Sequence, residues 1–172
     1  MRRMLGLIVG VMLFSAGCGG VAEIPMKESV GSQLTEAQKF SLKNLDGGVT
    51  DLSRVLTQKK LVLINFWATW CGFCVEEMPD LVKLQAKNEA KSFTVLAVNV
   101  GESAKRASSF AKKHKLNFPV VLDQDNAVSQ NYGLVGIPMS FLISSDGKVI
   151  GEYQAFTPEL VSDVEKNLKS SQ

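Results

Sequence analysis

Two cysteines separated by two residues, Cys71 and Cys74, are the side chains in this sequence best suited to chemistry. At this spacing two thiols can close into a disulfide across one helical turn and open again, so the pair can exchange two electrons. A cysteine at the start of a helix lies near free backbone N–H groups and the positive end of the helix dipole, which lower its thiol pKa. Because the thiolate is the nucleophile, Cys71 is predicted to attack a disulfide. Cys74, one turn further on, is more shielded and suits the second step, in which the captured sulfur is released.

A strand must end just before this pair, and a helix must begin at it. The apolar run at 61–64 predicts a buried strand, and the apolar spacing over 75–84 predicts an amphipathic helix. Pro79 interrupts this helical pattern, so we expect a bend near it, because a proline in a helix interior removes a hydrogen bond and crowds the preceding turn. The dithiol is therefore predicted to lie at a strand-to-helix junction, at the edge of a sheet.

The rest of the chain alternates strand and helix patterns. The near-continuous apolar run at 93–100 is typical of a strand covered on both faces, and Asp146-Gly147 predicts a hairpin between the last two strands. Together these patterns predict an α/β sandwich, with a mixed central β-sheet flanked by helices. Further strands are expected at 39–43, 118–123, 141–144 and 149–153, and helices at 51–56, 103–115, 126–132 and 158–168.

Length and charge limit the possible functions. The 172 residues are 45% hydrophobic and 21% charged, which is typical of one globular domain with its own core. The formal net charge is +2, and removal of Arg2 and Arg3 with an export signal would leave 17 basic against 17 acidic residues. No basic stretch is interleaved with aromatic residues, so the sequence does not indicate a nucleic-acid partner.

The N-terminus has the order of an export signal. Arg2 and Arg3 precede an apolar stretch at 5–14 that is too short to span a bilayer. The following Ser15-Ala16-Gly17-Cys18 resembles a bacterial lipobox, in which the cysteine is lipidated and becomes the mature N-terminus, although Ser15 stands where leucine is commonest. An ordinary signal peptide with an incidental Cys18 is the alternative. We expect a lipoprotein signal peptide at 1–17, a lipidated N-terminus and flexible linker at 18–38, and a folded domain at 39–172 that is anchored to a membrane of the bacterial cell envelope, in the periplasm or another extracytoplasmic space.

Three features together resemble the thioredoxin-like fold: the Trp-Cys-x-x-Cys motif between a strand and a helix, an Ile-Pro pair before a later strand, and the Asp-Gly hairpin. More narrowly, the chain is similar to the TlpA/ResA-like thiol-disulfide oxidoreductases of the bacterial envelope. The segment FWATWCGFC, the following Glu77-Met78-Pro79, the extra helix and strand within 103–123, and the export signal carry this resemblance. It covers about 39–168 and implies a thioredoxin-like three-layer sandwich.

The resemblance also implies roles for individual residues. The two cysteines take the attacking and resolving roles. Pro138 would be a cis-proline facing the disulfide, and Ile137 before it would offer backbone hydrogen bonds to a substrate chain. Glu77 aligns with an acidic residue near the dithiol, where it would move the proton of Cys74 or tune the two thiol pKa values. Trp70, beside the first cysteine, is a candidate for lining the substrate surface, with simple packing as the alternative.

The sequence departs from the family pattern at two places. Asn65 stands where cytoplasmic thioredoxins carry a buried aspartate, so Glu77 is the candidate replacement for that proton acceptor. The dipeptide between the cysteines is Gly72-Phe73, without a proline. Since this dipeptide helps to set the redox balance, the resemblance does not fix the reduction potential.

These observations predict an enzyme, an extracytoplasmic thiol-disulfide oxidoreductase that reduces protein disulfides, for example those of apocytochrome c in cytochrome c maturation. It would receive electrons from a membrane partner and use no cofactor beyond the Cys71–Cys74 disulfide and no metal. A structural zinc site is disfavoured, because it needs four ligands and the mature chain offers, besides these cysteines, only His114. The sequence also leaves open a structural disulfide, a copper carrier on the same fold, a peroxidase, and a binding module with an idle dithiol. The copper carrier is disfavoured because such proteins separate their cysteines by three residues and add a distal histidine, whereas the gap here is two. The peroxidase is disfavoured because it needs a Thr-x-x-Cys type site, which this sequence lacks.

Overall fold

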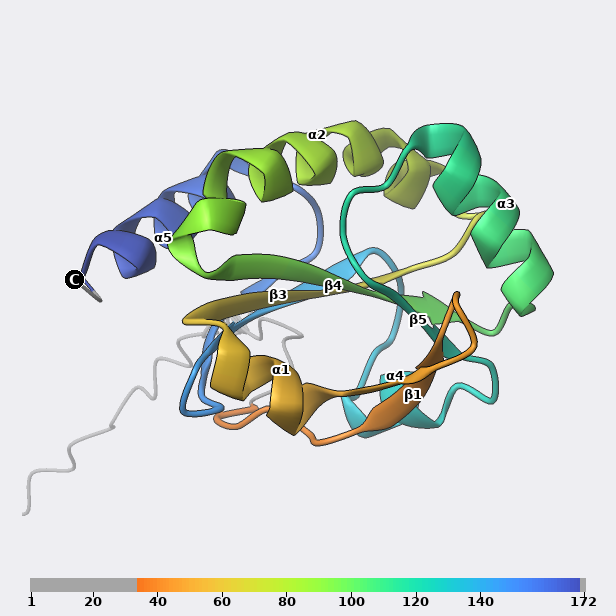
Figure 1. Cartoon of the computed structure of the whole chain (residues 1–172), viewed down its shortest axis with the longest axis horizontal. Helices are drawn as coiled ribbons and strands as arrows, with labels where there is room; N and C mark the ends of the chain where they lie inside the picture. The colour runs from red at the N-terminus through yellow and green to blue at the C-terminus, as the bar shows by residue number, and fades with distance from the viewer. Residues whose placement is uncertain (1–33, 171–172) are drawn as a thin grey trace, which may run out of the picture. The chain divides into compact units, whose positions relative to one another are not determined.

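The computed structural model describes residues 34–170, which form one seven-stranded mixed sheet with helices on both faces (Figure 1). The strand order is β2-β1-β5-β4-β3-β6-β7. The predicted signal peptide, Cys18 and most of the predicted linker lie outside the described residues. The strands are β1 (Ser41–Asn44), β2 (Val49–Asp51), β3 (Leu61–Trp67), β4 (Phe93–Val100), β5 (Val120–Asp123), β6 (Met139–Ser144) and β7 (Val149–Tyr153). The helices are α1 (Leu52–Gln58), α2 (Gly72–Asn88), α3 (Ala104–His114), α4 (Ala127–Asn131) and α5 (Pro158–Ser170), and a 3₁₀ turn spans Glu89–Lys91.

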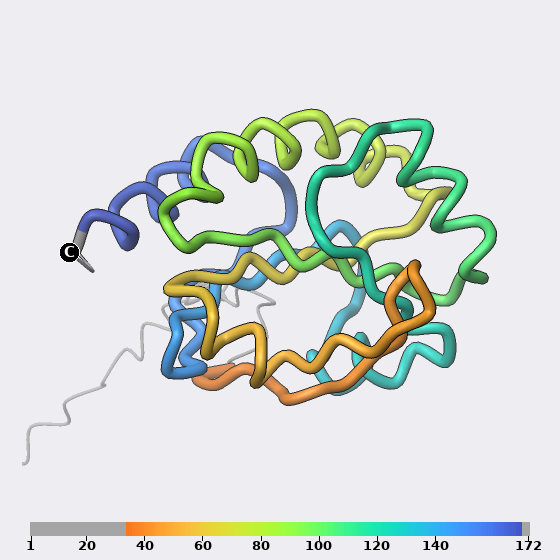
Figure 2. Tube along the Cα trace, in the orientation of Figure 1, coloured from red at the N-terminus to blue at the C-terminus, as the bar shows by residue number. Residues whose placement is uncertain are grey.

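The two most apolar strands lie at the centre of the sheet. β3 pairs with β4 in parallel and with β6 in antiparallel register, and β4 pairs in parallel with β5. All of β3 is buried, as is all of β4 except its last residue, because helices cover both faces there. The helices α2, α3 and α5 lie on one side of the sheet and α1 and α4 on the other, so the predicted mixed α/β sandwich is confirmed (Figure 1). The path from β3 through α2 into β4 can be followed in Figure 2.

Two details of the structure add to the sequence prediction. The sequence pattern does not indicate the short edge strand β2, because its three residues are too few to show an alternation. Helix α2 continues through Pro79, which is exposed and neither ends nor divides the helix. Proline here removes only the hydrogen bond to the carbonyl of Val75, and one missing bond does not end a helix whose buried face is well packed.

The segment just before the expected domain start already contacts the sheet. Glu36 forms a β-bridge with Lys148, and the N–H of Ala37 donates to the carbonyl of Gly147 at 2.8 Å. The hydroxyl of Tyr132 donates to the carbonyl of Gln38 at 2.9 Å. Residues 34–38 therefore run along the start of β7 rather than apart from the domain.

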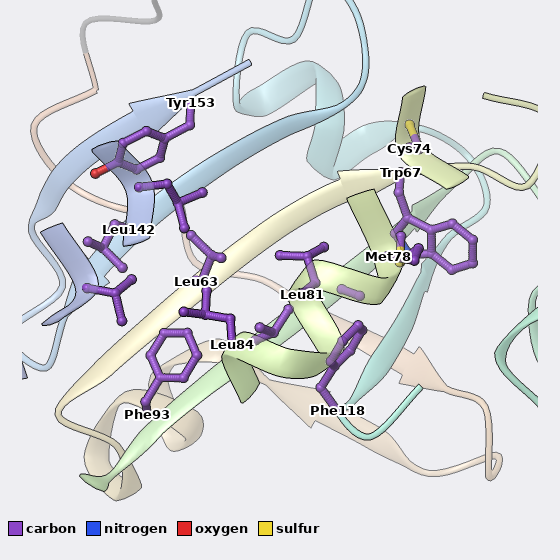
Figure 3. Packing of buried hydrophobic residues seen from close by; sticks show 14 of the residues in the cluster. Leu63, Trp67, Cys74, Met78, Leu81, Leu84, Phe93, Phe118, Leu142 and Tyr153 are labelled. Atoms are coloured by element: carbon purple, nitrogen blue, oxygen red, sulfur yellow. The ribbon is translucent and has the colours of Figure 1, made fainter. Parts of the chain in front are cut away.

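The core on the α2 side of the sheet extends directly to the cysteine pair. Figure 3 shows Leu81 and Leu84 of α2 packing toward Leu63 of β3, with Met78 on the same helix between these leucines and Cys74. Cys74 has no exposed surface. Since the second cysteine is thus part of the hydrophobic core, its sulfur is held in place by packing as well as by the helix.

The close approach of Gly151 to Tyr153 gives a stability prediction. A Cβ at position 151 would lie 2.2 Å from the hydroxyl oxygen of Tyr153, which itself donates to Asp163 of α5 at 2.7 Å. Gly151→Ala must therefore displace the tyrosine from α5, and we expect it to lower the free energy of unfolding by about 1–3 kcal/mol in urea titrations. Gly72→Ala is the control, because a Cβ there meets nothing within 4 Å. A Gly151→Ala protein as stable as the wild type would contradict the expected clash.

Candidate active site

Cys71 and Cys74 form a disulfide at the junction of β3 and α2, with their Cα atoms 5.2 Å apart. Cys71 is the N-cap residue of α2, and its sulfur accepts the backbone N–H of Cys74 at 3.2 Å. A hydrogen bond from a helix N-terminus favours negative charge on the sulfur once the disulfide is reduced. Cys71 is also the more accessible of the two, since 7% of its surface is exposed and none of that of Cys74. The placement fits an attacking Cys71 and a resolving Cys74.

The segment before β6 closes over the disulfide. The Ile137–Pro138 peptide bond is cis, as the resemblance to thioredoxin-like proteins implied. The carbonyl oxygen of Ile137 lies 3.7 Å from the sulfur of Cys71. Pro138 is buried and Ile137 half-buried, so the structure brings both residues to the dithiol.

Glu77 lies one helical turn after Cys74, on the buried side of α2. Its Oε1 accepts from the amide of Asn65 at 2.8 Å, and its Oε2 accepts the backbone N–H of Phe156 at 3.0 Å. Burial raises the pKa of the Glu77 carboxyl above its ordinary value, although these two hydrogen bonds oppose the rise. Because its pKa is raised, this carboxylate is a better proton acceptor than that of a solvated glutamate.

Asn65 of β3 supports this carboxyl. Its Nδ2 also donates to the hydroxyl of Ser140 at 3.0 Å, and its Oδ1 has no hydrogen-bond partner among the residues that the structure describes. Asn65 is fully buried, so the residue that departs from the cytoplasmic thioredoxins contacts Glu77 directly. The sequence singled out both residues. The Phe156 N–H could not be foreseen, because a backbone donor leaves no signal in residue type.

Apolar side chains surround the disulfide at the surface. Trp70 is 67% exposed, Phe73 between the cysteines 74%, and Val135 before the cis-proline 84%. Two cavities flank the cis-proline segment, one of about 330 Å³ that includes Phe73 and one of about 420 Å³ that includes Trp70 and Val135, and both are bordered by Ile137. Large apolar groups exposed in this way are typical of a surface that binds a partner. The sequence interpretation gave Trp70 as a candidate but did not assign Phe73 or Val135 to this surface.

Glu102 is a further site residue that the sequence interpretation missed. It follows β4, yet its carboxylate accepts both the backbone N–H and the hydroxyl of Thr69, two residues before Cys71. It lies between Gly101 and Ser103, a composition typical of loops, so its residue type and position gave no sign of a functional role. Only the fold brings these residues, 33 positions apart, into contact.

His114 has a different surrounding from the cysteine pair. Its ring stacks on Phe110 of α3, with centroids 4.0 Å apart, and Phe110 in turn packs against the buried Trp67. Trp67 therefore packs in the core, whereas Trp70 lies at the surface.

Within residues 34–170, no helix is both long and apolar enough to cross a membrane.

Comparison with known proteins gives a consistent result. The Redoxin family model matches residues 30–168. The chain is 32% identical over 156 residues to the thiol-disulfide oxidoreductase ResA of Bacillus cereus, covering 88% of this chain and 87% of the relative. It is 38% identical over 124 residues to ResA of Bacillus subtilis, covering 72% and 68%. The solved thioredoxin domain of a thiol-disulfide oxidoreductase from Bacteroides vulgatus superposes with a TM-score of 0.71 at 26% identity, covering 78% of this chain and 96% of that one.

These matches agree with the geometry of the site. The predicted thioredoxin-like fold and the predicted enzyme class are both confirmed by them. A disulfide at a strand-to-helix junction, with one accessible and one buried sulfur, suits thiol-disulfide exchange. The chain belongs to the redoxin family, as a ResA-like thiol-disulfide oxidoreductase with a thioredoxin-like fold.

Proposed function

We propose that this protein is an extracytoplasmic reductase of protein disulfides, tethered to a membrane through Cys18. The observation that carries thiol-disulfide exchange at Cys71 is the unequal pair of sulfurs, and the reducing direction is proposed from the family resemblance. Cys71 meets the surface and accepts the N–H of Cys74, while Cys74 is sealed in the core beneath it. A substrate sulfur can therefore bond only to Cys71, and the resolving attack must come from inside the protein.

The reaction balances in two exchanges. The Cys71 thiolate attacks one sulfur of a substrate disulfide, forms a mixed disulfide and releases the other substrate sulfur as a thiolate, which takes up a proton. Glu77 then accepts the proton of the Cys74 thiol, and the Cys74 thiolate attacks the sulfur of Cys71. This attack breaks the mixed disulfide and releases the second substrate sulfur as a thiolate, which takes up the proton held by Glu77. The substrate gains two electrons and two protons, and the enzyme is left with the Cys71–Cys74 disulfide.

The apolar surface around the disulfide supports a protein substrate over a small thiol. Trp70, Phe73 and Val135 present exposed apolar area on both sides of Cys71, which a small polar disulfide would leave uncovered. The carbonyl of Ile137, 3.7 Å from the Cys71 sulfur, would accept a backbone N–H from an extended substrate chain. The proposed substrate is thus a polypeptide with apolar residues beside its disulfide, and apocytochrome c is the candidate that the family resemblance implies.

The N-terminal sequence supports the location. An apolar stretch preceded by Arg2 and Arg3 and followed by Cys18 has the order of a lipoprotein signal. Attachment at Cys18 would hold the domain on the outer side of a membrane. Because that compartment oxidises thiols, a membrane partner must then supply two electrons per turnover to reopen the Cys71–Cys74 disulfide.

Replacing the resolving cysteine tests the proposal. In Cys74→Ser, the mixed disulfide on Cys71 cannot be released from inside the protein, so substrate proteins should accumulate as covalent adducts in the native host. The adducts are isolated under non-reducing conditions and identified by mass spectrometry of the Cys71 peptide. The double variant Cys71→Ser/Cys74→Ser is the matched control and should carry none. Adducts that are equally abundant in the double variant, or absent from Cys74→Ser, would refute the reductase mechanism.

A further inference from the structure

The loop that carries Cys71 is held by a carboxylate from another part of the chain. Between β3 and α2 the chain turns sharply, and the N–H of Cys71 donates to the carbonyl of Ala68 at 3.2 Å. Thr69 lies in this turn and is half-buried, while Trp70 next to it is exposed to solvent. The turn is tied to the rest of the protein at Thr69, through two hydrogen bonds to Glu102.

Glu102 binds Thr69 with both of its oxygens. Its Oε2 accepts the backbone N–H of Thr69 at 2.7 Å, and its Oε1 accepts the Thr69 hydroxyl at 2.6 Å. Oε2 also accepts from the amide of Asn99 at 2.8 Å, and Arg106 lies 3.6 Å from Oε1. The glutamate side chain is only 2% exposed, so these contacts are made away from solvent. Although burial disfavours the charge, the hydrogen bonds from Thr69 and Asn99 outweigh it, and the pKa of Glu102 lies below its ordinary value.

The backbone around Glu102 is itself fixed to the sheet. Gly101 has a φ of +69°, and its N–H donates to the carbonyl of Asp123 at the end of β5 at 2.9 Å. The side chain of Gln124 donates to the carbonyl of Glu102 at 3.3 Å. Glu102 thus links the ends of β4 and β5 to the loop at the end of β3. A rigid support of this kind is what holding a reactive side chain in place requires.

We propose that Glu102 is a positioning residue, which acts through Thr69 to hold the Cys71 sulfur against the helix N-terminus and beside the Ile137 carbonyl. The inference rests on the proposed function, since it assigns to Glu102 a part in preparing Cys71 for attack. A carboxylate suits this task because it can accept two hydrogen bonds from one residue and a third from Asn99 without a donor of its own. The backbone N–H and the hydroxyl of Thr69 then both have an acceptor, and these two hydrogen bonds hold the turn in place.

The positioning role and a purely electrostatic role predict opposite changes in the thiol of Cys71. If Glu102 acts by its charge, removing that charge lowers the pKa of Cys71, because a negative neighbour disfavours the thiolate. If it acts by holding the loop, its loss lets the Cys71 sulfur drift from the N–H of Cys74, and the pKa of Cys71 rises. Thr69→Val removes one contact without changing the charge at all, so it isolates the geometric effect.

The experiment measures the alkylation of reduced Cys71 by iodoacetamide across a range of pH, in the full chain, with the Cys71 peptide quantified by mass spectrometry. Glu102→Ala should raise the pKa of Cys71 and slow its alkylation at neutral pH by about tenfold, which corresponds to one pKa unit. Thr69→Val should also raise the pKa of Cys71 and slow its alkylation, by a smaller amount than Glu102→Ala. Glu102→Gln keeps the shape and part of the contacts, so its pKa and rate should lie between those of Glu102→Ala and the wild type. The control is Glu89→Gln, an exposed glutamate on the 3₁₀ turn, which should match the wild type.

Two results would overturn the inference. One is a pKa of Cys71 that falls in Glu102→Gln, which would assign Glu102 an electrostatic role. The other is a pKa that stays at the wild-type value in Thr69→Val and Glu102→Ala proteins that retain their fold by circular dichroism. If Glu102→Ala does not fold, Thr69→Val alone decides. A wild-type Cys71 that titrates as an ordinary thiol would instead refute the proposed function, so the two failures are distinguishable.

Discussion

Cys71→Ser should remove all reduction of protein disulfides by the enzyme. Only the direct reduction of the substrate by the added small dithiol should remain. A serine hydroxyl cannot form the mixed disulfide, and Cys74 is too deeply buried to reach a substrate in its place. The fold should survive, because serine is among the best residues at a helix N-cap and can accept the N–H that the Cys71 sulfur now accepts. The measurement is the release of free thiols from a disulfide-bonded polypeptide in the presence of a small dithiol.

The chain supplies its own control for this change. Cys18→Ser makes the same substitution at the third cysteine, outside the described residues, and should leave the rate of exchange in solution at the wild-type value. If Cys71→Ser kept a substantial part of the wild-type rate while Cys74→Ser lost it, the two cysteines would have to exchange roles. A Cys18→Ser protein without activity would show that the dithiol alone is not sufficient.

The sequence predicted the centre of the fold well, because the central elements carry strong local signals. The apolar runs of β3 and β4 identify strands covered on both faces, and the regular apolar spacing in α5 identifies a helix against the sheet. β2 carried no comparable signal, since it is short and partly exposed at the edge. Pro79 predicts a bend, and the structure shows that α2 continues through it to Asn88.

The site was predictable where function depends on residue type and less so where it depends on contacts between distant segments. The motif identified the cysteine pair, and the family resemblance supplied Glu77 and Pro138. Glu102 could not be found this way, because its partner Thr69 is 33 positions away and neither residue is unusual in a loop. The hydrogen bond from Phe156 to Glu77 is similarly hidden, as it joins positions 79 apart through a backbone N–H.

Glu77→Gln should slow the resolving step and change its dependence on pH. The variant cannot accept the proton of Cys74, and positioned acid–base groups typically contribute about 10²–10⁴-fold to a rate. We expect a loss at the lower end of this range near neutral pH, because Cys74 can still ionise in a small fraction of molecules. The measurement starts from a mixed disulfide between Cys71 and a small aromatic thiol and follows release of that thiol across pH.

The wild type and Glu77→Gln should differ in how the rate of thiol release depends on pH. In the wild type the rate should rise as Glu77 loses its proton, with an inflection above the ordinary pKa of glutamate, because burial raises the pKa of Glu77. In Glu77→Gln this inflection should be absent, and the rate should rise only at alkaline pH, where Cys74 itself ionises. Glu76→Gln is the matched control, since it makes the same change at an exposed neighbour on α2 and should keep the wild-type profile. An inflection that persists in Glu77→Gln would assign the proton transfer to another group.

The raised pKa of Glu77 also predicts how the stability of the fold depends on pH. This dependence tests Glu77 without an assay of thiol-disulfide exchange. Because the pKa of Glu77 is raised in the folded state, the folded protein binds more protons than the unfolded chain between the ordinary and the raised pKa. The contribution of Glu77 to stability is therefore complete below the unfolded pKa and is lost as the pH rises through the folded pKa. The difference in unfolding free energy between the wild type and Glu77→Gln, measured in urea over this window, should shift against the wild type as the pH rises. A difference that stays constant over the same window would mean that folding leaves the pKa of Glu77 unchanged, and its case as the proton acceptor for Cys74 would lose its physical basis.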